Sequence, residues 1–245
     1  MENTIQLKSG TNFWISREQN SCPLCEGVGF QLIASQGQTL ARKCRCISAA
    51  RIHNLQSRSG LPEQSWGESL PALNPRSLEE IQLVDSLKQF LEKKDLPLLQ
   101  LWIAPSPKTN ALLVSRAFAN ELIGTLGYCC LWLDCTELAQ LPARTNPAHL
   151  SRFDPTLALG GDFLFLVNYR KGALKSKMQN WLEEVLEERL KNRKSVFFIG
   201  PRPEGFVDHQ QLFTNPTLGI SILRKFRTLE PGKGELLPPH TGWLF

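Results

Sequence analysis

The chain has 245 residues, of which 42% are hydrophobic and 21% are charged. This composition is typical of a folded protein with a sizeable core, and it excludes a disordered chain, a collagen-like repeat and a disulfide-stabilised miniprotein. No apolar run is long enough to span a bilayer, and the first ten residues lack the apolar core of a secretory signal. The sequence therefore predicts a cytoplasmic protein without a membrane span.

The formal net charge of +5 is concentrated near the N-terminus. Residues 1–60 hold seven Lys and Arg against three Asp and Glu, so +4 of the total lies in this quarter of the chain. A local excess of basic residues indicates an acidic partner such as nucleic acid, although charge alone does not define a binding site.

Four of the seven cysteines lie in the same N-terminal quarter. Cys22 and Cys25 form a C-x2-C pair, and after 18 residues Cys44 and Cys46 form a C-x-C pair. Two such pairs supply the four thiolates of a tetrahedral zinc site, and a reducing compartment favours metal over disulfides. We interpret residues 1–60 as a module held together by structural zinc. The alternative is a set of four reduced thiols without metal.

Basic residues surround the second cysteine pair and are candidates for contact with nucleic-acid phosphates. A solvated surface is the alternative. The candidates are Arg42, Lys43, Arg45 and Arg51.

The rest of the chain alternates between helical and strand-like patterns. Residues 61–76 form a linker rich in Pro and Gly turns, and Ser77 with Glu80 then forms a capping box. Helices are predicted from residue 77 and over 111–124 and 175–193, and strands over 98–104, 128–133, 162–167, 195–199 and 223–229. This alternation predicts an α/β domain over residues 77–229, with a parallel sheet covered on both faces. Residues 230–245 are expected to form an extended tail.

The remaining cysteines lie in or beside one of the apolar runs, so we expect them to behave as core residues rather than as ligands. They are Cys129, Cys130 and Cys135.

Several stretches resemble the bacterial helicase loaders of the DnaI/DnaC type, whose relatives include the IstB transposition ATPases. They are residues 22–29 (CPLCEGVG), 44–46 (CRC), 57–62 (SRSGLP) and 119–122 (ANEL), together with the helix that contains Trp181. The resemblance covers nearly the whole chain. It implies a zinc-binding N-terminal domain that contacts the replicative helicase, and a C-terminal AAA+ domain, with the P-loop NTPase fold, that binds ATP and single-stranded DNA.

The stretch aligned with the P-loop of that family departs from its pattern. It reads PSPKTNAL over residues 105–112 and contains no glycine. Pro105 lacks the N–H group that would cradle a phosphate, and Ala111 and Leu112 stand at the places of the Lys and the Ser/Thr that bind phosphate and Mg²⁺. Lys108 and Thr109 repeat this dipeptide, but three residues too early.

Three further motifs of the family are also replaced. Val167 and Asn168 stand where its acidic pair should end a strand, and Gly200-Pro201 stands at the place of a polar sensor. Ser221-Ile222 occurs where Ser and the arginine finger are expected, with Arg224 as a nearby substitute.

These departures favour a pseudo-ATPase that binds no nucleotide and has no catalytic residues. On this interpretation the protein is an adaptor related to helicase loaders. Its partner would be a replicative helicase or a related AAA+ protein, and single-stranded DNA is a second candidate. Two alternatives stay open, a nucleic-acid-binding zinc protein and an ATPase with a rebuilt nucleotide site. A role outside replication is also compatible with the sequence.

Overall fold

The computed structural model describes residues 30–35, 38–43, 45–92, 100–104, 108–146, 155–170, 172, 174–201, 212–229 and 236–237. The chain divides into two compact units, Met1–Arg51 and Ile52–Phe245. The division falls within helix α1 (Arg45–Ser59), which begins in the first unit and ends in the second.

The first unit contains a β-hairpin. Strand β1 (Phe30–Ser35) pairs antiparallel with β2 (Gln38–Lys43), and Phe30 lies opposite Lys43. The open end of the hairpin is therefore the end at which these two residues are paired.

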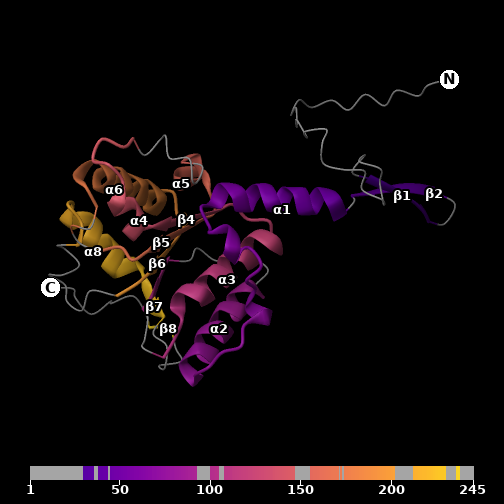
Figure 1. The fold of residues 1–245 in the computed structure, drawn as a ribbon, viewed down its shortest axis with the longest axis horizontal. Coiled ribbons are helices and arrows are strands. Elements are labelled where there is room, and N and C mark those ends of the chain that lie inside the picture. The colour runs from indigo at the N-terminus through magenta and orange to yellow at the C-terminus, as the bar shows by residue number, and fades with distance from the viewer. Residues whose placement is uncertain are drawn as a thin grey trace. The chain divides into compact units, whose positions relative to one another are not determined.

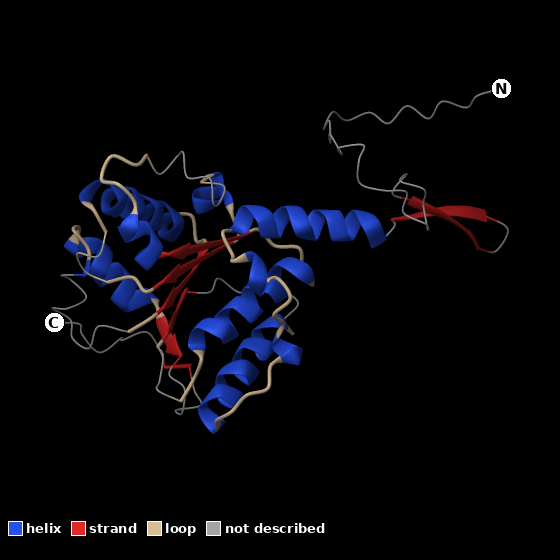
Figure 2. Ribbon diagram, in the orientation of Figure 1, coloured by secondary structure: helices blue, strands red, loops and turns tan. Residues whose placement is uncertain are grey.

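The second unit is an α/β domain in which helices and strands alternate (Figures 1 and 2). It begins with two 3-10 turns and a long helix, η1 (Glu63–Ser65), η2 (Leu70–Ala72) and α2 (Leu78–Leu91). The following elements are β3 (Gln100–Ile103), α3 (Ala111–Gly124), β4 (Cys130–Asp134), α4 (Cys135–Gln140), α5 (Thr156–Gly160), β5 (Phe163–Val167), α6 (Ser176–Lys191), β6 (Ser195–Ile199), α8 (Pro216–Lys225), β7 (Arg227–Leu229) and β8 (Leu236–Leu237).

The strands of this unit form one sheet in the order β4-β5-β6-β3-β7-β8. The pairs from β4 through β7 are parallel, and β8 pairs antiparallel with β7. The prediction of a parallel sheet is confirmed for β3 to β7, whereas the antiparallel strand β8 lies in the segment that the sequence predicts to be an extended tail.

Each face of the sheet packs against its own set of helices, because successive side chains of a strand point to opposite faces. In β5, Phe163, Phe165 and Val167 join the core cluster that contains α2 and α3. Leu164 and Leu166 join the second cluster, which contains residues of α4, α5, α6 and α8. Figure 2 shows helices on both sides of the sheet, which agrees with the predicted covering of both faces.

The connections between the strands create a topological switch point at the carboxyl end of the sheet. After β3 the chain enters α3 on one face, and after β6 it enters α8 on the other face before β7 pairs with the far side of β3. The adjacent strands β3 and β6 therefore lead to opposite faces, which defines a topological switch point. Open α/β sheets bind ligands outside the carboxyl ends of their strands at such a point.

The predicted strand over residues 223–229 is wrong for its first three residues, which belong to α8. The helix begins at Asn215, whose side chain accepts a hydrogen bond from the Thr217 N–H group. Leu218 and Ile222 are buried four residues apart, which is the spacing of one helical face. The final strand is thus shorter than its apolar pattern suggests.

The residues that the sequence treats as a linker, 61–76, pack onto the α/β domain. Leu61 and Leu70 are buried in the same core cluster as α3. Arg116 of α3 also holds this segment, because its guanidinium donates hydrogen bonds of 2.9 and 2.8 Å to the carboxylate of Glu68. The first contacts of the domain are therefore made before α2 begins.

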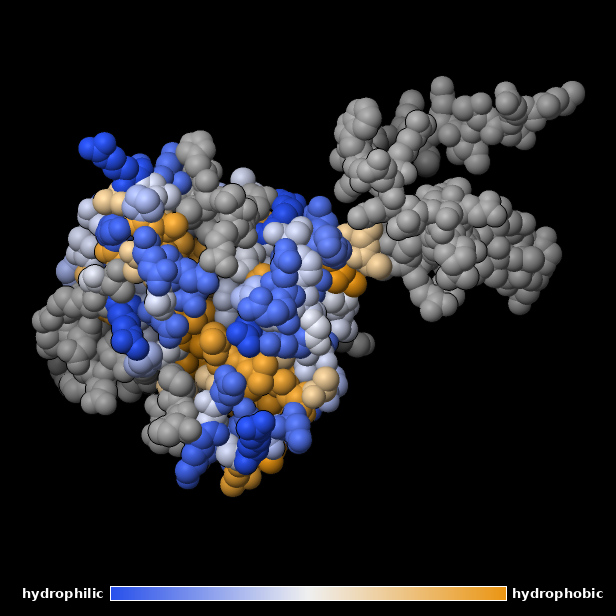
Figure 3. Space-filling view, in the orientation of Figure 1, coloured by the Kyte–Doolittle hydropathy of each residue, from blue (hydrophilic) through white to orange (hydrophobic). Residues whose placement is uncertain are grey.

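The described part of the molecular surface mixes hydrophilic and hydrophobic residues, as Figure 3 shows for one face. Among its large exposed hydrophobic side chains, Leu78 and Ile81 lie at the start of α2, whereas Leu126 follows α3 and Leu159 belongs to α5. Among the described helices, none combines the length and the apolar character needed to cross a membrane.

Candidate functional site

The carboxyl ends of β3, β5 and β6 are held together by backbone hydrogen bonds. The Gly200 N–H group donates to the Ile103 carbonyl at 3.1 Å, and the Asn168 N–H group donates to the Ile199 carbonyl at 2.8 Å. The indole N–H of Trp102 donates to the Gly200 carbonyl at 2.9 Å. Because these bonds fix Asn168 and Gly200, the residues that follow β5 and β6, the carboxyl end of the sheet next to α3 is a defined surface.

Two residues at this edge adopt unusual backbone conformations. Asn168 has φ of +55°, a left-handed conformation that Asn tolerates better than most residues, and Gly200 has φ of +154°. In the family pattern, the first of these positions holds the second acid of the acidic pair, and the second lies at the place of a polar sensor. In this chain they hold an amide and a glycine, while Val167 is fully buried in the core.

Helix α3 begins beside this edge. Its N-cap is Asn110, whose side-chain oxygen accepts a hydrogen bond from the Leu113 N–H group at 3.1 Å. Ala111, the first residue of the helix, is buried in the core, and Leu112 is half-buried. Methyl and isobutyl groups donate no hydrogen bonds and carry no charge, so these two side chains offer a phosphate or a Mg²⁺ ion no ligand. Pro105 lies outside the described residues.

The backbone ahead of α3 is bound to the start of α2 by a carboxylate. Glu80 is 7% exposed, and its two oxygens accept hydrogen bonds from different segments. The Arg76 N–H group donates at 2.7 Å and the Asn110 N–H group at 3.2 Å. A carboxylate of α2 thus accepts a hydrogen bond from one of the N–H groups at the N-terminus of α3. This is the end of a helix that attracts anions.

The predicted capping box of α2 is confirmed in its first half. The Ser77 hydroxyl oxygen accepts a hydrogen bond from the Glu80 N–H group at 3.1 Å. The reciprocal bond of Glu80 comes from Arg76, one residue before the N-cap. The Ser77 hydroxyl in turn donates to the Lys108 carbonyl at 2.7 Å, which is a second link between α2 and the residues before α3.

Lys108 lies on the surface near the beginning of α2. Its ammonium nitrogen is 3.8 Å from a carboxylate oxygen of Glu79, and its side chain is 73% exposed. Thr109, the other member of the displaced dipeptide, is half-buried. The geometry therefore pairs Lys108 with an acid of the chain itself.

The expected place of the arginine finger lies in α8 and is also occupied by a residue of another kind. Ile222, at the expected place of the arginine finger, is completely buried in the core beneath the helix. Arg224 is exposed in the last turn of the same helix.

Most of the predicted zinc ligands fall outside the described residues. This applies to Cys22, Cys25 and Cys44, while Cys46 is the second residue of α1. Wherever side chains are described, no group of three or more His, Cys, Asp or Glu is arranged to hold a metal ion. The predicted zinc site stays a prediction.

The candidate nucleic-acid residues are all in regular structure. Arg42 and Lys43 end β2, Arg45 begins α1, and Arg51 is exposed further along the same helix. All four lie in the first unit, within ten residues of one another.

The three other cysteines are free thiols of the α/β domain. Cys130 and Cys135 are buried as expected, and Cys129 is half-buried. Burial raises the pKa of the Cys130 and Cys135 thiols far above the ordinary value, so both are protonated at neutral pH. Such thiols are poor nucleophiles and poor metal ligands.

Sequence reasoning missed Arg189 of α6, which is 1% exposed and is the most buried cation among the residues that the structure describes. Its guanidinium donates hydrogen bonds of 2.8 to 3.1 Å to the backbone carbonyls of Ala158, Gly161, Asp162 and Ser195. Burial lowers the pKa of Arg189 to about 10, so the group is charged at neutral pH. It lies at the amino ends of β5 and β6, away from the candidate site, and its role is structural.

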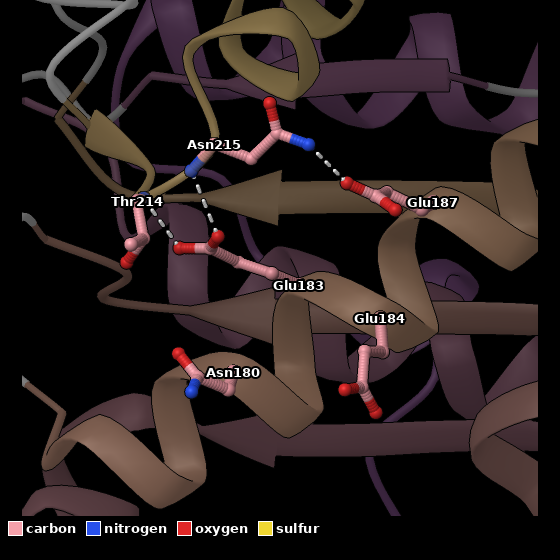
Figure 4. A pocket seen from close by; sticks show the side chains of 6 residues that line it. All are labelled: Asn180, Glu183, Glu184, Glu187, Thr214 and Asn215. Atoms are coloured by element: carbon pink, nitrogen blue, oxygen red, sulfur yellow. Dashed lines mark hydrogen bonds between the residues drawn. The ribbon is translucent and has the colours of Figure 1, made fainter.

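A surface pocket of about 250 Å³ lies between α6 and the start of α8 (Figure 4). Buried Glu183 accepts hydrogen bonds from the N–H groups of Thr214 and Asn215 at 2.7 and 3.1 Å, and the Asn215 side chain donates to Glu187 at 2.5 Å. These bonds fix α8 against α6. The carboxylate of Glu183 is thus fully used in holding the fold together.

Comparison with solved structures identifies the fold. A crystal structure of the DnaC helicase loader matches with a TM-score of 0.52 and 13% sequence identity, covering 69% of this chain and 98% of that one. A crystal structure of DnaI matches at 0.48 with 17% identity (67% and 87% of the two chains), and AMPPCP-bound DnaA from Aquifex aeolicus at 0.44 with 16% identity (62% and 47%). No protein-family model and no curated protein matches the sequence. The first of these likenesses confirms the helicase-loader fold that the resemblance implies, a P-loop NTPase-like parallel sheet flanked by helices.

Proposed function

We propose that this protein is a non-catalytic adaptor with a helicase-loader fold, which binds a protein partner and does not hydrolyse ATP. The observation that carries the proposal is the chemistry at the start of α3. The helix begins at the switch point of the sheet, yet it presents Ala111 and Leu112 and has the Asn110 N–H group bonded to Glu80.

Phosphoryl transfer needs groups that differ from the residues at the aligned positions of this chain. It depends on positive charge and a metal ion placed against the phosphate oxygens, and the loss of one preorganised stabilising group slows such reactions by about 10²- to 10³-fold. Here the Lys, the Ser/Thr and the acidic pair are all replaced, by Ala111, Leu112, Val167 and Asn168. Several simultaneous losses of this size would remove useful turnover.

Binding of Mg²⁺-ATP to the purified full-length chain tests the first half of the proposal. We expect no saturable heat in isothermal titration and no phosphate release above a heat-inactivated sample. Lys108→Ala is the variant to compare with the wild type, because Lys108 is the cation of the stretch that aligns with the P-loop, residues 105–112. Saturable binding that Lys108→Ala abolishes would reject the proposal in favour of an ATPase with a rebuilt site.

The partner-binding part of the proposal rests on the N-terminal unit, as the resemblance implies. A replicative helicase is the first candidate partner, and a related AAA+ protein is the second. We expect the full-length chain to co-elute with a replicative helicase in size-exclusion chromatography. Separate elution from every helicase and AAA+ protein offered would count against an adaptor role.

We also propose that Cys22, Cys25, Cys44 and Cys46 hold a structural zinc ion. The β-hairpin supports this, because Phe30 and Lys43 pair at its open end, and the two cysteine pairs flank that end in sequence. Zinc would supply folding energy to a unit too small for a large core.

Metal analysis of the purified protein tests the zinc proposal. We expect one zinc per chain in the wild type and much less in Cys22→Ser, which should also lose partner binding. Cys129→Ser should retain both, since Cys129 belongs to the other unit. A wild-type protein without zinc, purified under reducing conditions and without chelators, would contradict the zinc site.

A second function, single-stranded DNA binding, is favoured by the four cations between Arg42 and Arg51. Each phosphate contact on a single strand contributes about −0.7 to the slope of log K against log salt. Replacing Arg51, which is exposed on α1, by Ala should make that slope less steep by about this amount. The absence of a DNA complex even at low salt would exclude this function.

A further inference from the structure

The position at which an α/β nucleotide-binding fold receives a phosphate is filled in this protein by its own side chain. In such folds the phosphate lies against the N-terminal N–H groups of the helix that follows a central strand at the switch point. Helix α3 is that helix here. The anion found at its N-terminus is the carboxylate of Glu80.

A capping box alone does not account for this carboxylate. A capping box satisfies N–H groups at the start of its own helix, and in α2 the bond from the Arg76 N–H group to Glu80 does this. The other oxygen of Glu80 accepts the Asn110 N–H group, which belongs to the next helix, thirty residues further along the chain. Glu80 therefore bridges the N-termini of two helices.

The surrounding contacts hold the carboxylate in that place. The Ser77 hydroxyl donates to the Lys108 carbonyl, and Lys108 pairs with Glu79, so the first turn of α2 is attached to residues 108–110 at three points. The N–H group of Leu113 is taken by the Asn110 side chain. With 7% of its surface exposed, Glu80 is enclosed as well as hydrogen-bonded.

We propose that Glu80 is an internal anion that replaces the nucleotide phosphate at the start of α3 and keeps this position closed to free phosphate. This inference rests on the proposed function, because it explains how a helicase-loader fold can be stable with its nucleotide site unused. A phosphate cannot take the Asn110 N–H group while a carboxylate holds it, and the two negative charges repel each other at such short range.

Titration of the full-length chain with inorganic phosphate, followed by ¹H–¹⁵N NMR at the Asn110 amide, tests the inference. In the wild type we expect this amide not to respond to phosphate beyond its response to sodium chloride of equal ionic strength. In Glu80→Ala we expect a saturable shift in the millimolar range. The control is Asp85→Ala, which removes an exposed acid further along α2, and it should behave like the wild type.

A second variant covers the case in which Glu80→Ala does not fold. Glu80→Gln keeps the size of the side chain and one acceptor oxygen but removes the charge, so it should give a smaller saturable shift at Asn110. If the folded Glu80 variants respond to phosphate no more than the wild type does, the inference is wrong. It is also wrong if the wild-type amide itself shows the saturable shift.

The two proposals fail in different ways. Saturable Mg²⁺-ATP binding by the wild type would reject the proposed function, whatever the Glu80 variants do. A wild type that binds no ATP, together with Glu80 variants that show no phosphate response, would reject only the internal anion.

Discussion

Replacing Arg189 by Met removes a buried guanidinium that joins α6 to α5 and to the amino ends of β5 and β6. Its four hydrogen bonds to backbone carbonyls have lengths of 2.8 to 3.1 Å. Met has a similar length and is apolar, so it fills much of the space but leaves these carbonyls without their donor. We therefore expect Arg189→Met to destabilise the α/β domain without changing its fold.

The magnitude follows from the number of acceptors left behind. A buried polar group that loses its partner costs about 1–3 kcal/mol, so four such carbonyls would cost about 4–12 kcal/mol together. Removing the guanidinium also recovers the cost of burying its charge, which is several kcal/mol and offsets part of this loss. We expect a decrease of about 3–5 kcal/mol in the free energy of unfolding of Arg189→Met. For a domain of this size this corresponds to a Tm lower by about 6–20 °C.

Urea unfolding followed by circular dichroism measures this free energy directly, provided that both variants unfold in one transition. Arg189→Lys should lie between Met and the wild type, because an ammonium keeps the charge but cannot reach carbonyls on several sides as a planar guanidinium does. The matched control is Lys191→Met in the same helix, whose exposed side chain should change stability by less than about 0.5 kcal/mol. An Arg189→Met variant as stable as this control would refute the assigned role of the guanidinium.

Three further predictions use other contacts of the second unit. Gly161→Ala should lower the free energy of unfolding by more than about 1 kcal/mol, because its Cβ would lie 2.6 Å from the Leu157 carbonyl oxygen; Gly160→Ala, which meets nothing within 4 Å, should be neutral or stabilising in the same urea assay. A double-mutant cycle on Arg116 and Glu68, both partly buried, should give a coupling energy of about 1 kcal/mol that decreases with salt, and zero coupling at low salt would contradict the observed pair. Because burial raises its pKa, Cys135 should resist iodoacetamide at pH 8 in the native protein and react once urea unfolds the chain; mass spectrometry after labelling would detect any native modification, which would contradict its burial.

The local patterns of the sequence predicted one helix and one strand to the residue. The helix over 111–124 and the strand over 195–199 have the bounds of α3 and β6. Both are largely apolar segments with clear ends, and their signals depend on neighbouring residues alone. The sequence also predicted Ser77 as the N-cap of α2, because a capping box is formed by residues within one turn.

Shorter elements without such signals were missed. The helix α8 has Asn215 as its N-cap and Pro216 as its first residue, and this dipeptide indicates a turn as readily as a helix start. The last residues of α8 were predicted as strand. Residues 61–76, which contain two 3-10 turns, were predicted to be a linker because of their Pro and Gly residues. Such residues indicate turns, but they do not reveal that Leu61 and Leu70 are buried.

For the candidate site, the sequence alone determined what is missing. Residue identity is enough to show that residues 105–112 contain no glycine, and that Ala111 and Leu112 stand where a Lys and a Ser/Thr are needed. No arrangement of the chain can give these side chains a charge or a hydrogen-bond donor.

Only the tertiary structure decided what stands there instead. The bond from Asn110 to Glu80 joins two helices, and the four bonds of Arg189 join segments up to 31 residues apart. In sequence, Glu80 is one acid of a capping box and Arg189 one cation of a charged helix. Their partners are set by how α2 and α6 pack on the sheet, because the free energy of a buried charge depends on neighbours in space rather than along the chain.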